Sequence, residues 1–265
     1  MKWLWAVFIV VLSQPLNAQD SGDFWVLTHP EEPFVVMDDK GVLHGLLVDE
    51  VNGILASAGI HQKILSAPWE RVEREARIKS NVLAFALTRT PEREHVYHWI
   101  TPLTANMYSV YSAKQLSQPI ANIEQLNTFD SIAVLENDVR HQILLKQGAK
   151  NIHVYSTWSD AIEGLASGRS SAIFFSDVGM RYYCKVQGKD CNQFHRVFLY
   201  EKTISYLTLS KNGTDTKLAN KLKSAAENYK KTAKFKEITE YWLKQYETLP
   251  IPMHMEDGVL NLWIK

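Results

Sequence analysis

The sequence is poor in several features that mark particular classes of protein. It contains only two cysteines in 265 residues, and their spacing is neither a CxxC motif nor a paired zinc-binding pattern. Lysine and arginine together number 29, as do aspartate and glutamate, so no broad field would attract nucleic acid or an anionic membrane. The motifs HExxH, GxSxG and GxGxxG are missing. We therefore expect no catalytic activity, no cofactor, no metal ion and no nucleic-acid partner.

The first 18 residues are predicted to be a secretory signal peptide. Lys2 supplies a positive charge, residues 3–12 are apolar, and the small residue Ala18 suits cleavage before Gln19. An uncleaved anchor is the alternative, but the apolar run is shorter than the ~20 residues that a membrane span needs. No cysteine follows the run, so a lipid anchor is not indicated. We expect an exported mature chain.

The two cysteines, Cys184 and Cys191, both lie in the part of the chain predicted to be exported. An oxidising compartment favours a disulfide between them. Residues 188–190 (Gly-Lys-Asp) read as a turn, which makes closure sterically possible. Because the closed loop is short, the disulfide should contribute only about 2 kcal/mol. A local structural role is favoured over a redox function.

Short apolar strands alternate with amphipathic helical patterns along most of the chain. Such alternation implies a mostly parallel sheet covered on both faces, so the predicted fold class is α/β. The predicted strands are 24–28, 63–66, 82–87, 131–135, 152–155, 171–175 and 204–209. The predicted helices are 48–58, 69–78, 138–146, 158–165, 218–229 and 235–246.

This order of elements suggests two lobes joined by two crossings of the chain, near residues 107–113 and 200–206. Lobe 1 is predicted to comprise residues 19–109 and 204–246, and lobe 2 residues 110–203. The two last helices need a surface to cover, and lobe 1 is the natural one. Residues 247–265 are left as a C-terminal tail.

Two motifs carry a resemblance to a known family. Residues 84–93 (AFALTRTPER) form an apolar strand that ends in a rigid turn with two arginines, and residues 68–71 (PWER) lie upstream. Together they resemble type II periplasmic solute-binding proteins, in particular the amino-acid-binding family 3 of bacterial ABC importers. Residues 32–34 (EPF) and the run from Gly168-Arg169 to Ser176-Asp177 resemble further family features. The resemblance covers residues 24–246 and implies a type II fold of two lobes, with lobe 2 inserted in lobe 1.

The resemblance implies that Arg93 clamps a ligand carboxylate, because a guanidinium can bind it through two parallel hydrogen bonds. The alternative is a surface arginine paired with Glu92 or Glu94. Thr88 matches a position whose hydroxyl binds the same carboxylate, although a strand would also favour this β-branched residue. Ala86 matches a position that contributes its backbone carbonyl.

Four further residues match positions around the family's ligand. Phe34 and Trp69 could form an aromatic wall, with the lobe 1 core as the alternative place for both. Asp177, or Ser176 if the alignment shifts by one residue, matches an acidic position that pairs with a ligand ammonium. The alternative is that either residue only caps the helix that follows.

Two acidic residues depart from the family pattern. Asp138 stands at a turn where most family members have glycine and hydroxyl residues, and Arg140 could offset its charge. Glu31 stands near a position where family members often carry an aromatic residue. An acid at the turn of Asp138 argues against a plain copy of amino-acid recognition, although Asp138 and Arg140 remain expected ligand contacts.

The predicted function is a periplasmic, monomeric binding protein for a small carboxylate-bearing ligand, an amino acid or a relative. Its membrane partner would be the permease of an ABC importer. The alternative is a sensor that signals to a membrane receptor kinase or cyclase, which the sequence cannot separate from import. An enzyme on the same scaffold, with Glu31 and His29 as reacting groups, is a third hypothesis.

Overall fold

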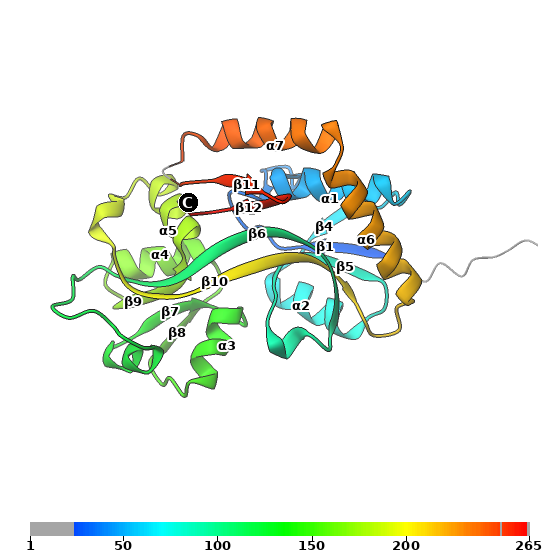
Figure 1. Cartoon of the computed structure of the whole chain (residues 1–265). Coiled ribbons are helices and arrows are strands. Elements are labelled where there is room, and N and C mark those ends of the chain that lie inside the picture. Colours follow the sequence, from blue (N-terminus) through cyan, green and yellow to red (C-terminus); the bar gives the residue numbers. More distant parts are fainter. Residues whose placement is uncertain (1–23, 250, 264–265) are drawn as a thin grey trace, which may run out of the picture.

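The computed structural model describes residues 24–249 and 251–263, so the predicted signal peptide lies outside the described residues. Two sets of parallel strands are joined into one sheet by two long antiparallel strands, β6 (Tyr97–Ser112) and β10 (His195–Ser210) (Figure 1). The strand order is β4-β1-β5-β10-β6-β9-β7-β8. This arrangement confirms the predicted α/β class. None of the helices within the described ranges has the length and apolarity to cross a membrane.

Lobe 1 is built on the parallel strands β1, β4 and β5. Its main core packs one face of this sheet against α1, α6 and α7, while a smaller cluster packs the other face against α2. Gly45, just before α1, has φ +127°, and a Cβ there would collide with the carbonyl oxygen of Phe34. The elements of lobe 1 are β1 (Trp25–Thr28), β2 (Val36–Met37), β3 (Leu43–His44), α1 (Leu46–Ser57), β4 (Ile64–Ser66), α2 (Trp69–Ile78), β5 (Val82–Thr88), η1 (Pro91–Arg93), α6 (Thr216–Lys230) and α7 (Ala233–Tyr246).

Lobe 2 is built on the parallel strands β7, β8 and β9. Helices α4 and α5 cover one face, and α3 with the short helix η2 covers the other. Each of the helices α3 to α7 begins with a polar side chain that accepts a hydrogen bond from a free backbone N–H group of the first turn. These side chains are Asp138, Thr157, Ser176, Asp215 and Thr232. The elements of lobe 2 are η2 (Ile123–Thr128), β7 (Ile132–Leu135), α3 (Val139–Lys146), β8 (Ile152–Tyr155), α4 (Trp158–Ala166), β9 (Ala172–Ser176), α5 (Asp177–Val186) and η3 (Cys191–Gln193).

The strands β6 and β10 pass from one lobe to the other as an antiparallel ribbon. The predicted crossings near 107–113 and 200–206 lie in this ribbon except for residue 113, but each strand spans 16 residues and is far longer than predicted. The register shifts at several places along the pair, for example between Ser205 and Tyr206. These irregularities break the strict alternation that would have marked two long strands in the sequence.

The C-terminal segment forms a hairpin of β11 (His254–Glu256) and β12 (Val259–Asn261). Strand β12 adds in parallel to the middle of β6, where Leu260 pairs with Thr104. Leu260 is buried in the main core of lobe 1, and Lys230 donates to the carbonyl oxygen of Gly258 at 2.6 Å. The segment predicted as a tail is therefore an integral part of the fold.

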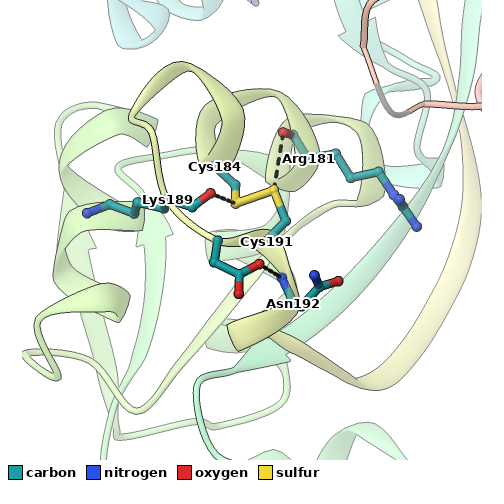
Figure 2. The surroundings of a disulfide bond; sticks show 6 residues. Arg181, Cys184, Lys189, Cys191 and Asn192 are labelled. Atoms are coloured by element: carbon teal, nitrogen blue, oxygen red, sulfur yellow. Dashed lines mark hydrogen bonds between the residues drawn. A yellow bond between two sulfur atoms is a disulfide. The ribbon is translucent and has the colours of Figure 1, made fainter.

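The predicted disulfide between Cys184 and Cys191 is present, with the two Cα atoms 5.6 Å apart. The bond joins the last turn of α5 to the first residue of η3 (Figure 2). Cys184 is fully buried in the core of lobe 2. This placement agrees with a local structural role.

Candidate functional site

A small cavity lies between the lobes, beyond the carboxyl end of β5 and beside the turn after β7. Ligands of open α/β sheets usually bind at such strand ends. The cavity volume is about 30 Å³, which is room for about one or two water molecules. Its lining comes from both lobes and consists of Glu31, Trp69, Ala86, Thr88, Arg93, Tyr108, Asp138, Val139, Arg140 and Trp158.

Strand β5 reaches the cavity through a bulge. Ala84 pairs with Thr208 and Leu87 with Tyr206, so Phe85 and Ala86 together stand opposite Leu207. Ala86 has φ +65°, a left-handed conformation that is unfavourable for alanine. Such strain is found mostly at functional sites, where the surrounding fold maintains it.

Arg93 is buried beside the cavity at the end of the η1 turn, with 7% of its surface exposed. Its Nη1 donates to the carbonyl oxygen of Thr88 at 3.0 Å, and its guanidinium lies 5.6 Å from the ring centre of Trp69. Within residues 24–249 and 251–263, no carboxylate forms an ion pair with Arg93. Glu92 pairs instead with Lys146, and Glu94 with Arg89. The alternative of a surface arginine paired with Glu92 or Glu94 is therefore wrong.

Three polar contacts lie at the cavity or near it. Trp69 Nε1 donates to the carbonyl oxygen of Asn137 at 3.1 Å, which links α2 of lobe 1 to the turn before α3 of lobe 2. Lys146 and Glu92 form an exposed ion pair between the same lobes at 2.7 Å. The hydroxyls of Thr88 and Tyr108 are 2.7 Å apart. The structure is thus a closed form in which the lobes touch around the cavity.

Asp138 and Arg140 form a buried ion pair at the lobe 2 end of the cavity. Nε and Nη2 of Arg140 donate to the two carboxylate oxygens of Asp138 at 2.5 and 2.8 Å. The guanidinium carbon lies 4.4 Å from the ring centres of both Tyr108 and Trp158. Burial would raise the pKa of Asp138, but the charge of Arg140 overcomes this and lowers it.

Glu31 lines the cavity. Part of its surface is open to solvent, but the walls of the cleft lie close around its carboxylate. This confinement raises the pKa of Glu31 to about 7, with Arg140 opposing the rise and Asp138 adding to it. His29 does not line the cavity, because its Nδ1 faces the carbonyl oxygen of Ala67 at 3.4 Å. Burial lowers the pKa of His29. Glu31 and His29 therefore do not converge on the cavity as a catalytic pair would.

The comparison with known families identifies the chain. The model of the bacterial extracellular solute-binding proteins, family 3, matches residues 25–245. The chain belongs to this family. Among curated proteins, the comparison finds no match.

Solved structures share the fold of this solute-binding protein at low sequence identity. A histidine kinase sensor domain with similarity to periplasmic binding proteins has a TM-score of 0.71 and 17% identity, covering 85% of this chain and 98% of its own. A mutant of ArgBP from T. maritima has a TM-score of 0.69 and 18% identity, covering 83% and 95%. ArtJ from Geobacillus stearothermophilus, an arginine-, lysine-, histidine-binding protein, has a TM-score of 0.64 and 19% identity, covering 84% and 96%.

The structure brings six of the nine residues predicted for the site of the solute-binding protein to the cavity. These are Trp69, Ala86, Thr88, Arg93, Asp138 and Arg140. Whether any of them contacts a ligand stays a prediction.

The other three predicted residues lie elsewhere in this closed form. Phe34 is buried in the main core of lobe 1 and packs edge-on against Tyr246. The hydroxyl of Ser176 accepts from the backbone N–H of Gly179 and caps α5. Asp177 accepts a hydrogen bond from the hydroxyl of Tyr111 and forms an ion pair with Arg196. The contacts agree with the alternative reading for Phe34, which is lobe 1 core, and for Ser176, which caps the helix. Asp177 does not cap the helix and instead contacts Tyr111 and Arg196.

Tyr108, Val139 and Trp158 line the cavity but were not identified from the sequence. Tyr108 lies within β6, whose extent the sequence did not reveal, and Trp158 fits the helical spacing of an ordinary core residue. Asp138 caps α3, which places Val139 and Arg140 in the first turn of that helix. The tertiary packing of β6, α3 and α4 in lobe 2 brings these side chains together.

Proposed function

We propose that this family 3 protein captures a small ligand carboxylate between its lobes, with Arg93 as the principal contact. The observation that supports this proposal is that the buried guanidinium of Arg93 donates to a carbonyl oxygen and lies beside an aromatic ring, with no ion pair to a carboxylate of the described residues. A buried charge needs a partner of opposite charge to offset its desolvation. A ligand carboxylate would supply that partner.

Thr88 and Ala86 would complete the carboxylate site from β5. The hydroxyl of Thr88 now contacts Tyr108 and could exchange this partner for a ligand oxygen. The backbone of Ala86 is displaced from regular pairing by the bulge, which leaves its polar groups for a ligand. The side chain of Trp69 would cover the ligand from lobe 1.

Ligand entry would require the lobes to separate. An amino acid needs far more than the cavity volume of about 30 Å³, which holds about one or two water molecules. Opening would break the contact between Trp69 and Asn137 and the ion pair between Lys146 and Glu92. The ribbon of β6 and β10 is the natural hinge, because the lobes are joined through it.

Delivery of the ligand to the permease of an ABC importer is the role we favour, for an exported, monomeric protein in the periplasm. Family membership and the amino-acid-binding neighbours ArgBP and ArtJ support import. Signalling to a membrane receptor kinase or cyclase is the second candidate. The fold similarity to a histidine kinase sensor domain favours it. Either output needs only that ligand binding changes the closure of the lobes.

A ligand screen with two matched arginine variants tests the proposal. The mature protein would be screened by thermal shift against amino acids, dipeptides and organic acids, because a ligand at ~100 times its Kd adds about 2.7 kcal/mol of stability. Arg93→Ala should weaken binding of any hit at least about 30-fold. Arg89→Ala is the control, since Arg89 is exposed and paired with Glu94. A hit that survives Arg93→Ala unchanged would refute the proposal.

A further inference from the structure

The side chain of Arg140 belongs to the cavity lining. It is 4% exposed, forms a two-point ion pair with Asp138, and has the rings of Tyr108 and Trp158 at equal distances of 4.4 Å. A carboxylate and aromatic faces are the groups that recognise a guanidinium ion. The protein thus surrounds one of its own side chains with a complete cation-binding site.

The site around Arg140 is held by contacts that do not depend on Arg140. Trp158 stacks on Phe175 with ring centres 3.9 Å apart, and Tyr108 is held by the hydroxyl of Thr88 and the ring of Phe174. These side chains belong to four elements, β5, β6, α4 and β9. The aromatic part should therefore keep its shape when the Arg140 side chain is shortened.

We propose that Arg140 is a specificity-determining residue that occupies the place of a cationic ligand side chain. The cleft would then accept a small carboxylate without such a side chain and reject arginine and lysine. That the ligand is a small carboxylate rests on the proposed function. That a cation site is filled by Arg140 rests only on the positions of Asp138, Tyr108 and Trp158. The Arg140 side chain would exclude cationic ligands by filling their place, while other contacts attract the correct ligand.

The charges that face the cavity agree with this ligand class. Asp138 and Arg140 neutralise each other, so the remaining charged groups of the lining are Arg93 and Glu31. The ion pair uses Nε and Nη2 of Arg140 and leaves Nη1 for another partner. A small anion between Arg93 and Nη1 of Arg140 would meet two cations, while a cationic side chain would find its carboxylate already occupied.

The test uses methylguanidinium chloride as a free analogue of the Arg140 side chain. In Arg140→Ala, the vacated site should bind this cation, and 10 mM should raise Tm by about 3–6 °C if its Kd is ~1 mM. Arg140→Met is the matched control, because methionine fills the site without a charge, and its Tm should not respond. The wild-type protein should not respond either. A sample with sodium chloride at the same concentration as the methylguanidinium chloride controls for ionic strength.

The possible outcomes separate this inference from the proposed function. Methylguanidinium has no carboxylate, so its binding should survive in the double variant Arg93→Ala/Arg140→Ala even if carboxylate capture by Arg93 is wrong. A folded Arg140→Ala variant that gives no response overturns the inference. If that variant does not fold, the wild-type ligand spectrum decides: binding of a small carboxylate without binding of L-arginine supports the inference, and binding of L-arginine overturns it.

Discussion

Removing the carboxylate of Asp138 should destabilise the protein strongly. In Asp138→Ala, the charge of Arg140 stays buried between Tyr108 and Trp158 without its partner. Breaking one side of a buried ion pair costs about 3–5 kcal/mol, and the lost cap of α3 adds about 1 kcal/mol. For a chain of this size, the total of about 4–6 kcal/mol corresponds to a fall in Tm of roughly 8–24 °C. Urea unfolding and calorimetry would measure both quantities.

A double variant tests the physical reason for this loss. Asp138→Ser/Arg140→Met removes both charges, keeps a capping hydroxyl at the start of α3 and fills the space with an apolar side chain. Replacing both members of a buried pair is often neutral or stabilising. We therefore expect the double variant to recover most of the stability that Asp138→Ala loses. A single variant that loses less than about 1 kcal/mol would show that the charge of Arg140 is not confined as described.

The stability that the ion pair of Asp138 and Arg140 contributes should decrease at low pH. The folded protein holds the pKa of Asp138 below its usual value of about 3.9. The contribution of the pair is therefore fully present above about pH 4 and is lost as the pH falls through the lowered pKa. Urea unfolding from about pH 5 down to about pH 2 would show this loss in the wild type, and the slope should be reduced in the double variant.

Three further outcomes are expected. Because the pKa of Glu31 is raised to about 7, the folded state binds more protons than the unfolded state and stability falls as the pH rises from about 4 to 7. Glu31→Gln should remove that part of the fall in urea titrations. Ala86→Gly should raise stability by roughly 1 kcal/mol, since glycine accepts φ +65° without strain. Leu260→Ala should cost about 2–5 kcal/mol, because this hairpin residue is buried in the core; an unchanged Tm would mean that the hairpin is not docked.

Much of the fold could be predicted from periodicity and caps. The helix Trp69–Ile78 was predicted with the bounds that the structure gives, because Pro68 begins it and one apolar face defines its length. The hairpin at the C-terminus was missed, although Asp257-Gly258 between short alternating runs is a known signal for such a turn. The ribbon strands were underestimated, because their shifting register hides the alternation.

The residues proposed to bind the ligand carboxylate, Thr88 and Arg93, could be predicted from the sequence. The aromatic surroundings of Arg140 could not. Residues 84–93 form one continuous motif, so Thr88 and Arg93 could both be proposed from it as ligand contacts. The surroundings of Arg140 come from Tyr108 and Trp158, which are far apart in the sequence and look like ordinary core residues. No local pattern encodes their convergence, which depends on how α3, α4 and β6 pack in the tertiary structure of lobe 2.

The most direct test of the central claim compares a carboxylate ligand with its uncharged amide. Calorimetric titration would use the ligand found by the screen and its primary amide, each with the wild type and with Arg93→Ala. We expect the amide to bind the wild type at least about 30-fold more weakly than the carboxylate, and the two to bind Arg93→Ala equally. An amide that binds the wild type as tightly as the carboxylate would contradict carboxylate capture by Arg93.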